Sequence, residues 1–238
     1  MAAGVRHELL MRALPALRHE MAAPVAAIRM AVLLMKHQLA SASMVDPAAL
    51  AERAAGIGDQ VAALPAGKQF LRGLELSSDG ESITRSDLVA QGTSLMRVAF
   101  DLRGISLRVG DEFSSEGGPR FPNSAALLYM FLGALGYLND NAEHVDAIRI
   151  EAEGADALRF SARHGETPIT DSPDDAHAAP RALAIDGVAL QLLADGLGYA
   201  ALILPDSVHF ELTPVALLAE TRAAPALDRQ EQSARGSG

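Results

Sequence analysis

The stretch that decides the fold is Arg18-His19-Glu20-Met21-Ala22-Ala23-Pro24-Val25-Ala26-Ala27-Ile28. It places a histidine next to an acid, with a proline five residues after the histidine. An exposed imidazole nitrogen can accept a phosphoryl group, and a neighbouring carboxylate can orient the ring and accept its proton. Proline removes a helical hydrogen bond and favours a kink one turn later. We therefore single out His19 as a candidate phospho-acceptor, Glu20 as its acid/base and Pro24 as a structural kink.

The residues on both sides of this stretch predict one long helix over residues 5–40. Apolar side chains recur at spacings of three and four, which is the pattern of a helix with one apolar stripe. The stripe consists of Leu10, Leu14, Leu17, Met21, Val25, Ile28, Val32 and Met35. His19 lies off this stripe, as a solvent-facing nucleophile would.

A second helix is expected to begin at Asp46-Pro47, with the aspartate as N-cap and the proline at the first helical position. It carries its own apolar positions from Leu50 to Leu64. Two antiparallel helices with one apolar stripe each cannot bury both stripes well alone. We therefore predict a two-helix hairpin that dimerises into a four-helix bundle.

A different pattern follows a linker at residues 77–82. Short alternating segments predict strands, and longer apolar segments predict helices. The expected order is helix 85–102, strand 105–109, helix 123–138, strands 147–152 and 157–162, a polar loop 165–180, helix 186–197, and strands 199–204 and 207–212. This order predicts an α/β sandwich with a mixed sheet, and hence an α+β chain. The expected units are residues 1–76 and 82–215, followed by a disordered tail at 216–238.

Composition narrows the possible functions. The chain has 238 residues, a net charge of −10 and no cysteine. An acidic surface disfavours nucleic acid and anionic membranes as partners. The absence of cysteine removes disulfides and thiolate chemistry, and the histidines show no metal-ligand spacing, so we expect no metal. No apolar run is long enough to span a bilayer and no signal-peptide pattern opens the chain, which favours a soluble, cytoplasmic protein.

Three segments together resemble the core of bacterial sensor histidine kinases. These segments are HEMAAPVAAI (19–28), ITRSDLVAQGTSLMRVAFDLRGISLRV (83–109) and FPNSAALLYMFLGALGYLNDNAE (121–143). That core is a dimerisation and histidine-phosphotransfer domain followed by a Bergerat-type ATP-binding domain, and the resemblance covers residues 5–214. It implies that His19 carries the phosphoryl group and that Glu20 serves as acid/base. Arg18 and Arg29 are then expected to steer the acidic active site of a docked receiver domain.

The second unit departs from that family at the residues that ATP chemistry needs. The alignment places Gly133 and Tyr137 where the family has its metal- and phosphate-contacting asparagines, and Asn139 and Asn141 are out of register. Without those side chains a magnesium ion lacks obvious oxygen ligands. The adenine-reading Asp-x-Gly-x-Gly turn is also missing after Arg163.

The glycines near the last helix do not replace the missing phosphate cradle. Residues 185–190, at the start of that helix, contain the single glycine Gly187. Gly196 and Gly198 fall at the end of the helix, where glycine is the usual stop. Phosphate binds at helix starts, so we expect a degenerate fold without nucleotide or other cofactor.

This combination resembles the dimeric histidine phosphotransferases of bacterial phosphorelays more than a working kinase. It predicts a homodimer that passes a phosphoryl group via His19 between receiver-domain aspartates, without binding ATP. Response-regulator receiver domains and an upstream hybrid kinase are the implied partners, and no sensor domain is recognisable. Two alternatives stay open: a sensor histidine kinase with a divergent ATP site, and a non-catalytic pseudokinase scaffold that binds a kinase or response regulator.

Overall fold

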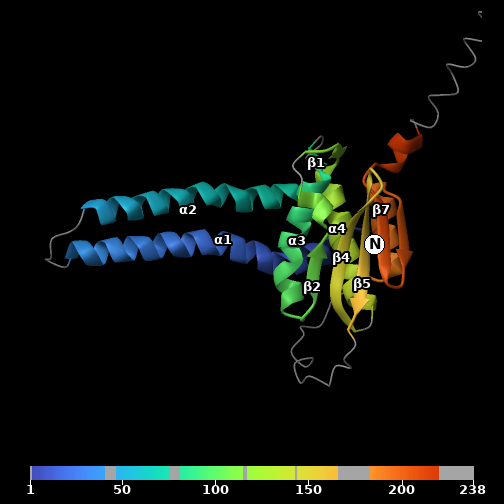
Figure 1. Ribbon diagram of the computed structural model, residues 1–238, viewed down its shortest axis with the longest axis horizontal. Helices are drawn as coiled ribbons and strands as arrows, with labels where there is room; N and C mark the ends of the chain where they lie inside the picture. The colour runs from blue at the N-terminus through green and yellow to red at the C-terminus, as the bar shows by residue number, and fades with distance from the viewer. Residues whose placement is uncertain are drawn as a thin grey trace, which may run out of the picture.

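A long helical hairpin projects from a helix-and-sheet unit in the computed structural model (Figure 1). The structure describes residues 2–40, 47–74, 81–114, 117–142, 144–165 and 183–219. The hairpin consists of α1 (Ala2–Ala40) and α2 (Pro47–Gly73). Pro47 is the first residue of α2, as expected from its fixed φ and missing N–H. The chain is therefore α+β, with a helical hairpin followed by a mixed sheet.

The main sheet has five strands in the order β2-β4-β5-β7-β6. Strands β2 and β4 are parallel, and the other neighbours are antiparallel. The strands are β2 (Ser106–Val109), β4 (Val145–Glu153), β5 (Ala157–His164), β6 (Ala201–Leu204) and β7 (Ser207–Glu211). The expected hairpin of β4 and β5 is confirmed, and Gly154 supplies the positive φ of 61° at its turn.

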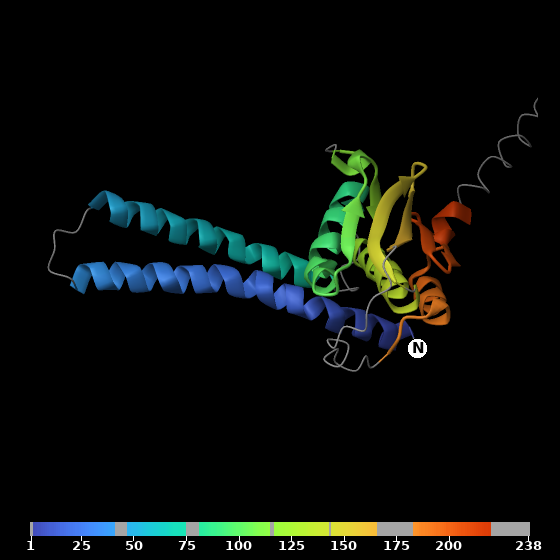
Figure 2. The ribbon, with the colours of Figure 1, turned by 60° about the horizontal axis from the view of Figure 1, so that its bottom comes forward.

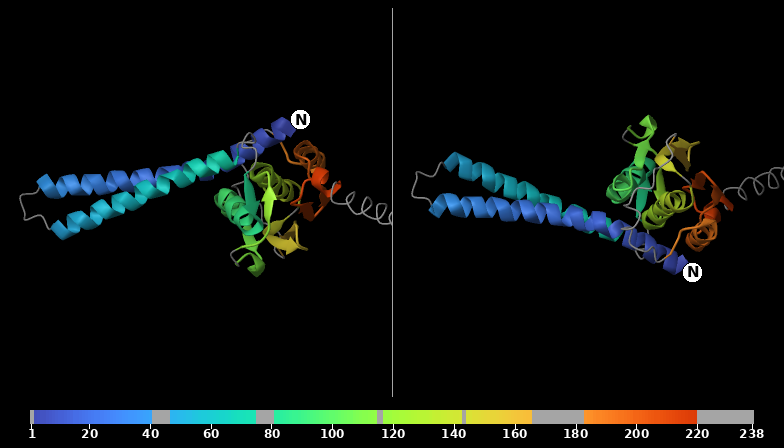
Figure 3. Two further views of the ribbon diagram at one scale, coloured as in Figure 1. Left: turned by 90° about the horizontal axis from the view of Figure 1, so that it is seen from above. Right: turned by 90° about the horizontal axis from the view of Figure 1, so that it is seen from below.

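Three helices cover one face of this sheet: α3 (Arg85–Asp101), α4 (Ser124–Asn141) and α5 (Gly187–Leu197). Helix α4 is apolar on all sides and buried from Ala125 to Leu138, because it is covered on both sides. On the sheet side Phe131 packs edge-on against Phe160 at 4.9 Å. On the other side the N-terminal end of α1 lies against α4 and α5 (Figures 2 and 3).

Helix α1 therefore belongs to both parts of the molecule. Its first turns contribute Val5, Leu9, Ala13 and Leu17 to the same buried core as the helices and sheet. The expected division into residues 1–76 and 82–215 assigns α1 to the first unit alone, so it does not account for this shared core. Because those side chains are buried by residues far along the chain, the α/β unit is complete only with the start of α1.

Several boundaries differ from the expected ones. Helix α4 continues to Asn141, where the Asn141 amide donates to the carbonyls of Tyr137 and Ile185 at 2.8 and 2.6 Å. A second, unpredicted sheet pairs β1 (Ser82–Thr84) with β3 (Arg120–Pro122). Residues 215–219 are helical, although the disordered tail was expected from 216. The amides of Leu217 and Leu218 both donate to the carbonyl of Pro214, which stabilises that turn.

Parts of other predictions fall outside the described residues. They are the N-cap Asp46, residues 77–80 of the predicted linker, residues 166–180 of the predicted polar loop and the tail from 220 onward. Within the described helices, none combines the length and apolarity that a bilayer span requires.

Candidate functional site

His19 lies on α1 immediately after the part of that helix that is buried. Leu17 is 1% exposed, whereas Arg18 and His19 are both exposed. No described residue forms a hydrogen bond or an ion pair with His19. The imidazole is therefore accessible on a helix that is held at its N-terminal side by the α/β unit.

The helix surface beside His19 is formed by small side chains. Residues at spacings of three, four and seven along a helix share a face, and here they are Ala22, Ala23 and Ala26. All three are exposed. A partner domain can therefore approach the imidazole without meeting a bulky neighbour on the following two turns.

The other residues of the candidate site are placed as follows. Arg29 is exposed, and it lies three helical turns, about 16 Å, beyond Arg18 on nearly the same face. Helix α1 runs continuously through Pro24, so the expected kink there stays a prediction. The Glu20 backbone is helical, but its side chain lies outside the part of the chain that the structure describes. The role of Glu20 toward the imidazole therefore also stays a prediction.

The N-terminal side of the candidate site is anchored by Arg12, a residue whose role was not predicted from the sequence. The Arg12 guanidinium donates to the Asp140 carboxylate on α4 at 2.8 Å and to the carbonyl of Leu183 at 2.9 Å. Its Nε donates to Glu8 at 3.0 Å. The dipeptide His7-Glu8 is the same as His19-Glu20 and lies earlier on the same helix. It has a structural explanation, because Glu8 pairs with Arg12 one turn later. Only the pair of Glu8 and Arg12 has a sequence signal, the i,i+4 spacing.

Asp140 is the centre of this anchor. Its side chain is 1% exposed, and its Oδ2 also accepts a hydrogen bond from the Ile185 amide at 2.9 Å. Burial, the largest single influence, lowers the Arg12 pKa, but the hydrogen bonds and charges of Asp140 and Glu8 together outweigh burial, and the Arg12 pKa is raised. Arg12 therefore stays charged, and the anchor joins α1, α4 and the segment that enters α5.

The face of α4 that would hold nucleotide in the resembling family is filled with apolar side chains. A Cβ at Gly133 would lie 2.8 Å from Leu193 Cδ2, 2.9 Å from Leu190 Cδ1 and 3.8 Å from Leu9 Cδ1. One turn later the Tyr137 hydroxyl donates to the Leu204 carbonyl at 3.1 Å, and burial raises the Tyr137 pKa. Gly133 therefore has no room for a longer side chain, and the Tyr137 hydroxyl is already engaged with a backbone carbonyl.

The two asparagines near these positions are used within the fold. The side-chain oxygen of Asn139 accepts a hydrogen bond from Arg103 at 2.7 Å, and its side-chain NH2 group donates to the Asp140 carboxylate at 2.7 Å. The Asn141 amide binds two backbone carbonyls. Across the described residues, no cluster of three or more His, Asp or Glu side chains could hold a metal ion.

The glycine at the end of α5 has the predicted structural role. Gly198 is left-handed, with φ 78° and ψ 31°, and its N–H donates to the carbonyls of Ala194 and Asp195. This geometry is that of a helix C-cap. The start of α5 is capped by Asp186, whose carboxylate accepts from the Ala189 amide at 2.7 Å. A carboxylate therefore occupies the helix end at which a phosphate would bind.

Comparisons with known proteins give a distant likeness. No family model matches the chain, and no curated protein matches it. Among solved structures, full-length ShkA in complex with AMPPNP has 16% identity over 84% of this chain and 44% of its own, with a TM-score of 0.32. The Acinetobacter baumannii histidine kinase AdeS has 12% identity over 81% of this chain and 94% of its own, with a TM-score of 0.32.

A third solved structure is the histidine kinase ThkA in complex with response regulator protein TrrA. It has 16% identity over 81% of this chain and 57% of its own, with a TM-score of 0.32. The chain thus spans about half the length of ShkA and of ThkA. A likeness at a TM-score of 0.32 assigns no function to this chain.

Proposed function

We propose that this chain is a homodimeric histidine phosphotransferase of a two-component phosphorelay. The observation that carries the proposal is the accessible His19 on α1, followed by exposed alanines and flanked by the exposed Arg18 and Arg29. An aspartyl phosphate on a receiver domain is anionic and protrudes from an acidic site. A cationic, unobstructed helix face is complementary to such a site.

The chemistry requires one attack and one release. The Nε2 lone pair of His19 forms a phosphorus–nitrogen bond as the phosphorus–oxygen bond to the receiver aspartate breaks, and that aspartate leaves as a carboxylate. The phosphorylated ring then carries a positive charge, with its proton on Nδ1. The Glu20 carboxylate accepts a hydrogen bond from this N–H and orients the ring. Transfer to a second receiver aspartate reverses these bond changes.

The packing around Gly133 supports a donor other than ATP. Leucine side chains from α1 and α5 occupy the α4 face on which the family resemblance would place nucleotide. The Arg12–Asp140 anchor holds α1 against that face. Nucleotide binding there would require α1 to separate from α4 and expose Leu9, which is fully buried.

The distal half of the hairpin supports a dimer. Met30, Leu33 and Leu34 lie close together on α1 and are 58%, 56% and 46% exposed, and Val61 on α2 is 51% exposed. Apolar side chains at i, i+3 and i+4 form a continuous surface on one helix face. A second copy of the hairpin would bury this surface in a four-helix bundle.

A phosphotransfer assay tests the proposal. Receiver domains from the source organism are phosphorylated with radiolabelled acetyl phosphate, freed of the donor and mixed with the full chain. We expect label to move to the wild-type protein and to a His7→Gln control, and to be lost in His19→Gln. Failure of His19→Gln to abolish labelling would contradict the proposal.

A parallel incubation with radiolabelled ATP separates the alternatives. A divergent kinase would label itself from ATP at His19 and bind ATP in calorimetry. A pseudokinase scaffold would bind a receiver but take label from neither donor. The proposed phosphotransferase takes label from the receiver alone.

A further inference from the structure

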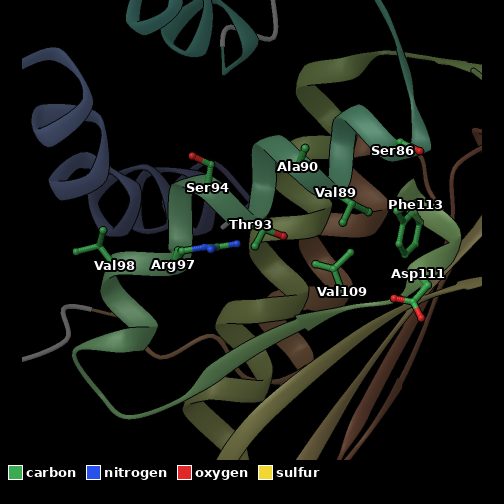
Figure 4. A pocket seen from close by; sticks show the side chains of 11 residues that line it. Ser86, Val89, Ala90, Thr93, Ser94, Arg97, Val98, Val109, Asp111 and Phe113 are labelled. Carbon is green, nitrogen blue, oxygen red and sulfur yellow. The ribbon is translucent and has the colours of Figure 1, made fainter. Parts of the chain in front are cut away.

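A cavity of about 610 Å³ lies between α3 and the edge strand β2 (Figure 4). This volume is within the range of sites that hold small organic molecules. The cavity shares no residue with the surface around His19. Strand β2 pairs only with β4, so the described sheet leaves the other side of β2 open next to the cavity.

Thr93 is one of the residues that line this cavity, and its hydroxyl is buried and, among the described residues, unsatisfied. The residue is 3% exposed, and its hydroxyl has no hydrogen-bond partner in the described structure. A buried hydroxyl without a partner is energetically unfavourable. Packing does not explain the presence of a hydroxyl here, because a valine side chain has nearly the same shape. A ligand that accepts a hydrogen bond would give the hydroxyl a partner.

Arg97 lies one turn beyond Thr93 on the same face of α3. Figure 4 shows its guanidinium extending toward Thr93 along the cavity. Within the described part of the chain, Arg97 forms neither an ion pair nor a hydrogen bond. A guanidinium and a hydroxyl at i and i+4 can both donate to one anionic group, and a carboxylate matches the planar guanidinium best.

The rest of the cavity wall is mainly apolar. Val89 on α3, Val109 on β2 and Phe113 line it. Phe113 is in η1 (Asp111–Ser114), and Arg85 lies over its ring at 5.9 Å, which helps to fix the ring. Asp111 is beside Phe113, away from Arg97 (Figure 4). A second negative charge on the ligand would meet Asp111, so a single carboxylate is favoured.

We propose that this cavity binds a small amphipathic monocarboxylate. Its carboxylate accepts hydrogen bonds from Arg97 and Thr93, and its apolar body packs against Val109 and Phe113. The proposal is independent of phosphotransfer, since it uses none of the residues assigned to that reaction.

Binding of 3-phenylpropionate to the full chain tests this proposal, with 3-phenylpropionamide as the neutral analogue of the same shape. Affinities come from calorimetry, and amide chemical shifts report the site. We expect millimolar or tighter binding of the acid, at least tenfold weaker binding of the amide, and shifts concentrated at Thr93, Val109 and Gly110.

Two variants and a control locate the site. Thr93→Val and Arg97→Gln should each weaken binding of the acid by fivefold or more. Arg108→Gln, which removes an exposed arginine of β2 that does not line the cavity, should leave it unchanged. The acid-to-amide comparison needs no variant, so it remains decisive if a substitution prevents folding.

Three results would overturn the proposal. The first is no detectable binding of the acid at a concentration 20-fold above the expected millimolar dissociation constant. The second is equal affinity for acid and amide, which would indicate an apolar cavity without an anion site. The third is shifts around His19 instead of α3, which would place the carboxylate at the phosphotransfer surface.

Discussion

The guanidinium of Arg12 and the carboxylate of Asp140 meet at 2.8 Å although 128 residues separate them in the chain. The two side chains are 14% and 1% exposed, so the pair is largely withdrawn from water. Asp140 also accepts from the Ile185 amide, and Arg12 also donates to the Leu183 carbonyl. This network fixes the helix that carries His19 to the body of the α/β unit.

Replacing Asp140 by asparagine should therefore be costly. The substitution keeps the shape of the side chain but removes the buried carboxylate, so the charged and partly buried Arg12 keeps only Glu8 as a counter-charge. We expect a loss of about 3 kcal/mol in the free energy of unfolding, measured by urea denaturation. The control is Glu151→Gln, which removes the exposed pair with Arg149 and should cost under about 1 kcal/mol. Equal effects of the two substitutions would show that the anchor contributes no more than a surface pair.

Gly92 on α3 is a second sensitive position. A Cβ there would lie 2.7 Å from Phe131 Cγ and closer still to other atoms of that ring. Phe131 is fully buried against Phe160 and cannot move aside freely. Gly92→Ala should destabilise the fold by about 1–3 kcal/mol in the same measurement. Gly58→Ala has open space around its new methyl group and should instead stabilise α2 by about 0.5–1 kcal/mol.

The exposed apolar surface of α1 gives a prediction about assembly. Replacing Leu33 and Leu34 by glutamate together places charges where a second hairpin would pack. Light scattering after size exclusion should change from twice the mass of one 25.0 kDa chain to a single chain. The matched control is Glu substitution at Leu202, which is 57% exposed on β6, and it should leave the mass unchanged. A wild-type protein that is already monomeric at micromolar concentration would contradict the dimer.

Glu112 should show a pH response with a definite sign. Its carboxylate accepts hydrogen bonds from the Ala152 amide, at 2.8 Å, and from its own backbone amide, and these hydrogen bonds lower the Glu112 pKa below the usual value of 4.5. A lowered folded-state pKa contributes stability above the unfolded value, which is lost as the pH falls through the folded value. The loss therefore begins below about pH 4.5 and stays under about 1 kcal/mol because the group is exposed.

The check on Glu112 is an NMR titration of its side-chain carboxyl carbon. The midpoint should lie below that of a glutamate in a blocked peptide. Glu112→Gln should remove the corresponding part of the acid-side slope in stability. A midpoint at or above the peptide value would refute the role of the Ala152 amide.

The same chemical change at two threonines should have opposite effects. Thr93→Val removes a buried hydroxyl that has no partner in the described structure, so it should stabilise the ligand-free protein by about 1 kcal/mol. Thr84→Val removes the N-cap of α3, whose hydroxyl oxygen accepts from the Asp87 amide at 3.1 Å, and should cost about 1 kcal/mol. Thermal unfolding of the two variants in parallel checks the signs.

Local patterns predicted most elements because each element carries its own signal. The end of α5 was correct because glycine at Gly198 allows a left-handed cap that other residues resist. The hairpin of β4 and β5 was correct because alternation and Gly154 both point to it. Strands β1 and β3 were missed, since three residues each are too short to show alternation.

The packing of α1 could not be predicted in the same way. The stripe of Leu10, Leu14 and Leu17 reads equally well as one bundle face, and nothing in the local sequence says that Leu9 and Ala13 face another unit. The Arg12–Asp140 pair has no spacing rule, because tertiary contacts between distant segments leave no periodic signal. For the site, the sequence identified His19, but its position just beyond the buried part of α1 required the fold.

The shared core also determines when the contacts of α1 can form during protein synthesis. The ribosome releases the first residues of α1 long before Gly133 of α4 and Leu193 of α5 exist. Leu9 must then remain exposed until α5 has emerged, because its partners come from the second half of the chain. Contacts of such long sequence separation form late and leave apolar surface open to aggregation in the meantime. A nascent chain that is halted before α5 should therefore be a substrate for chaperones, even though its helical hairpin has been fully translated.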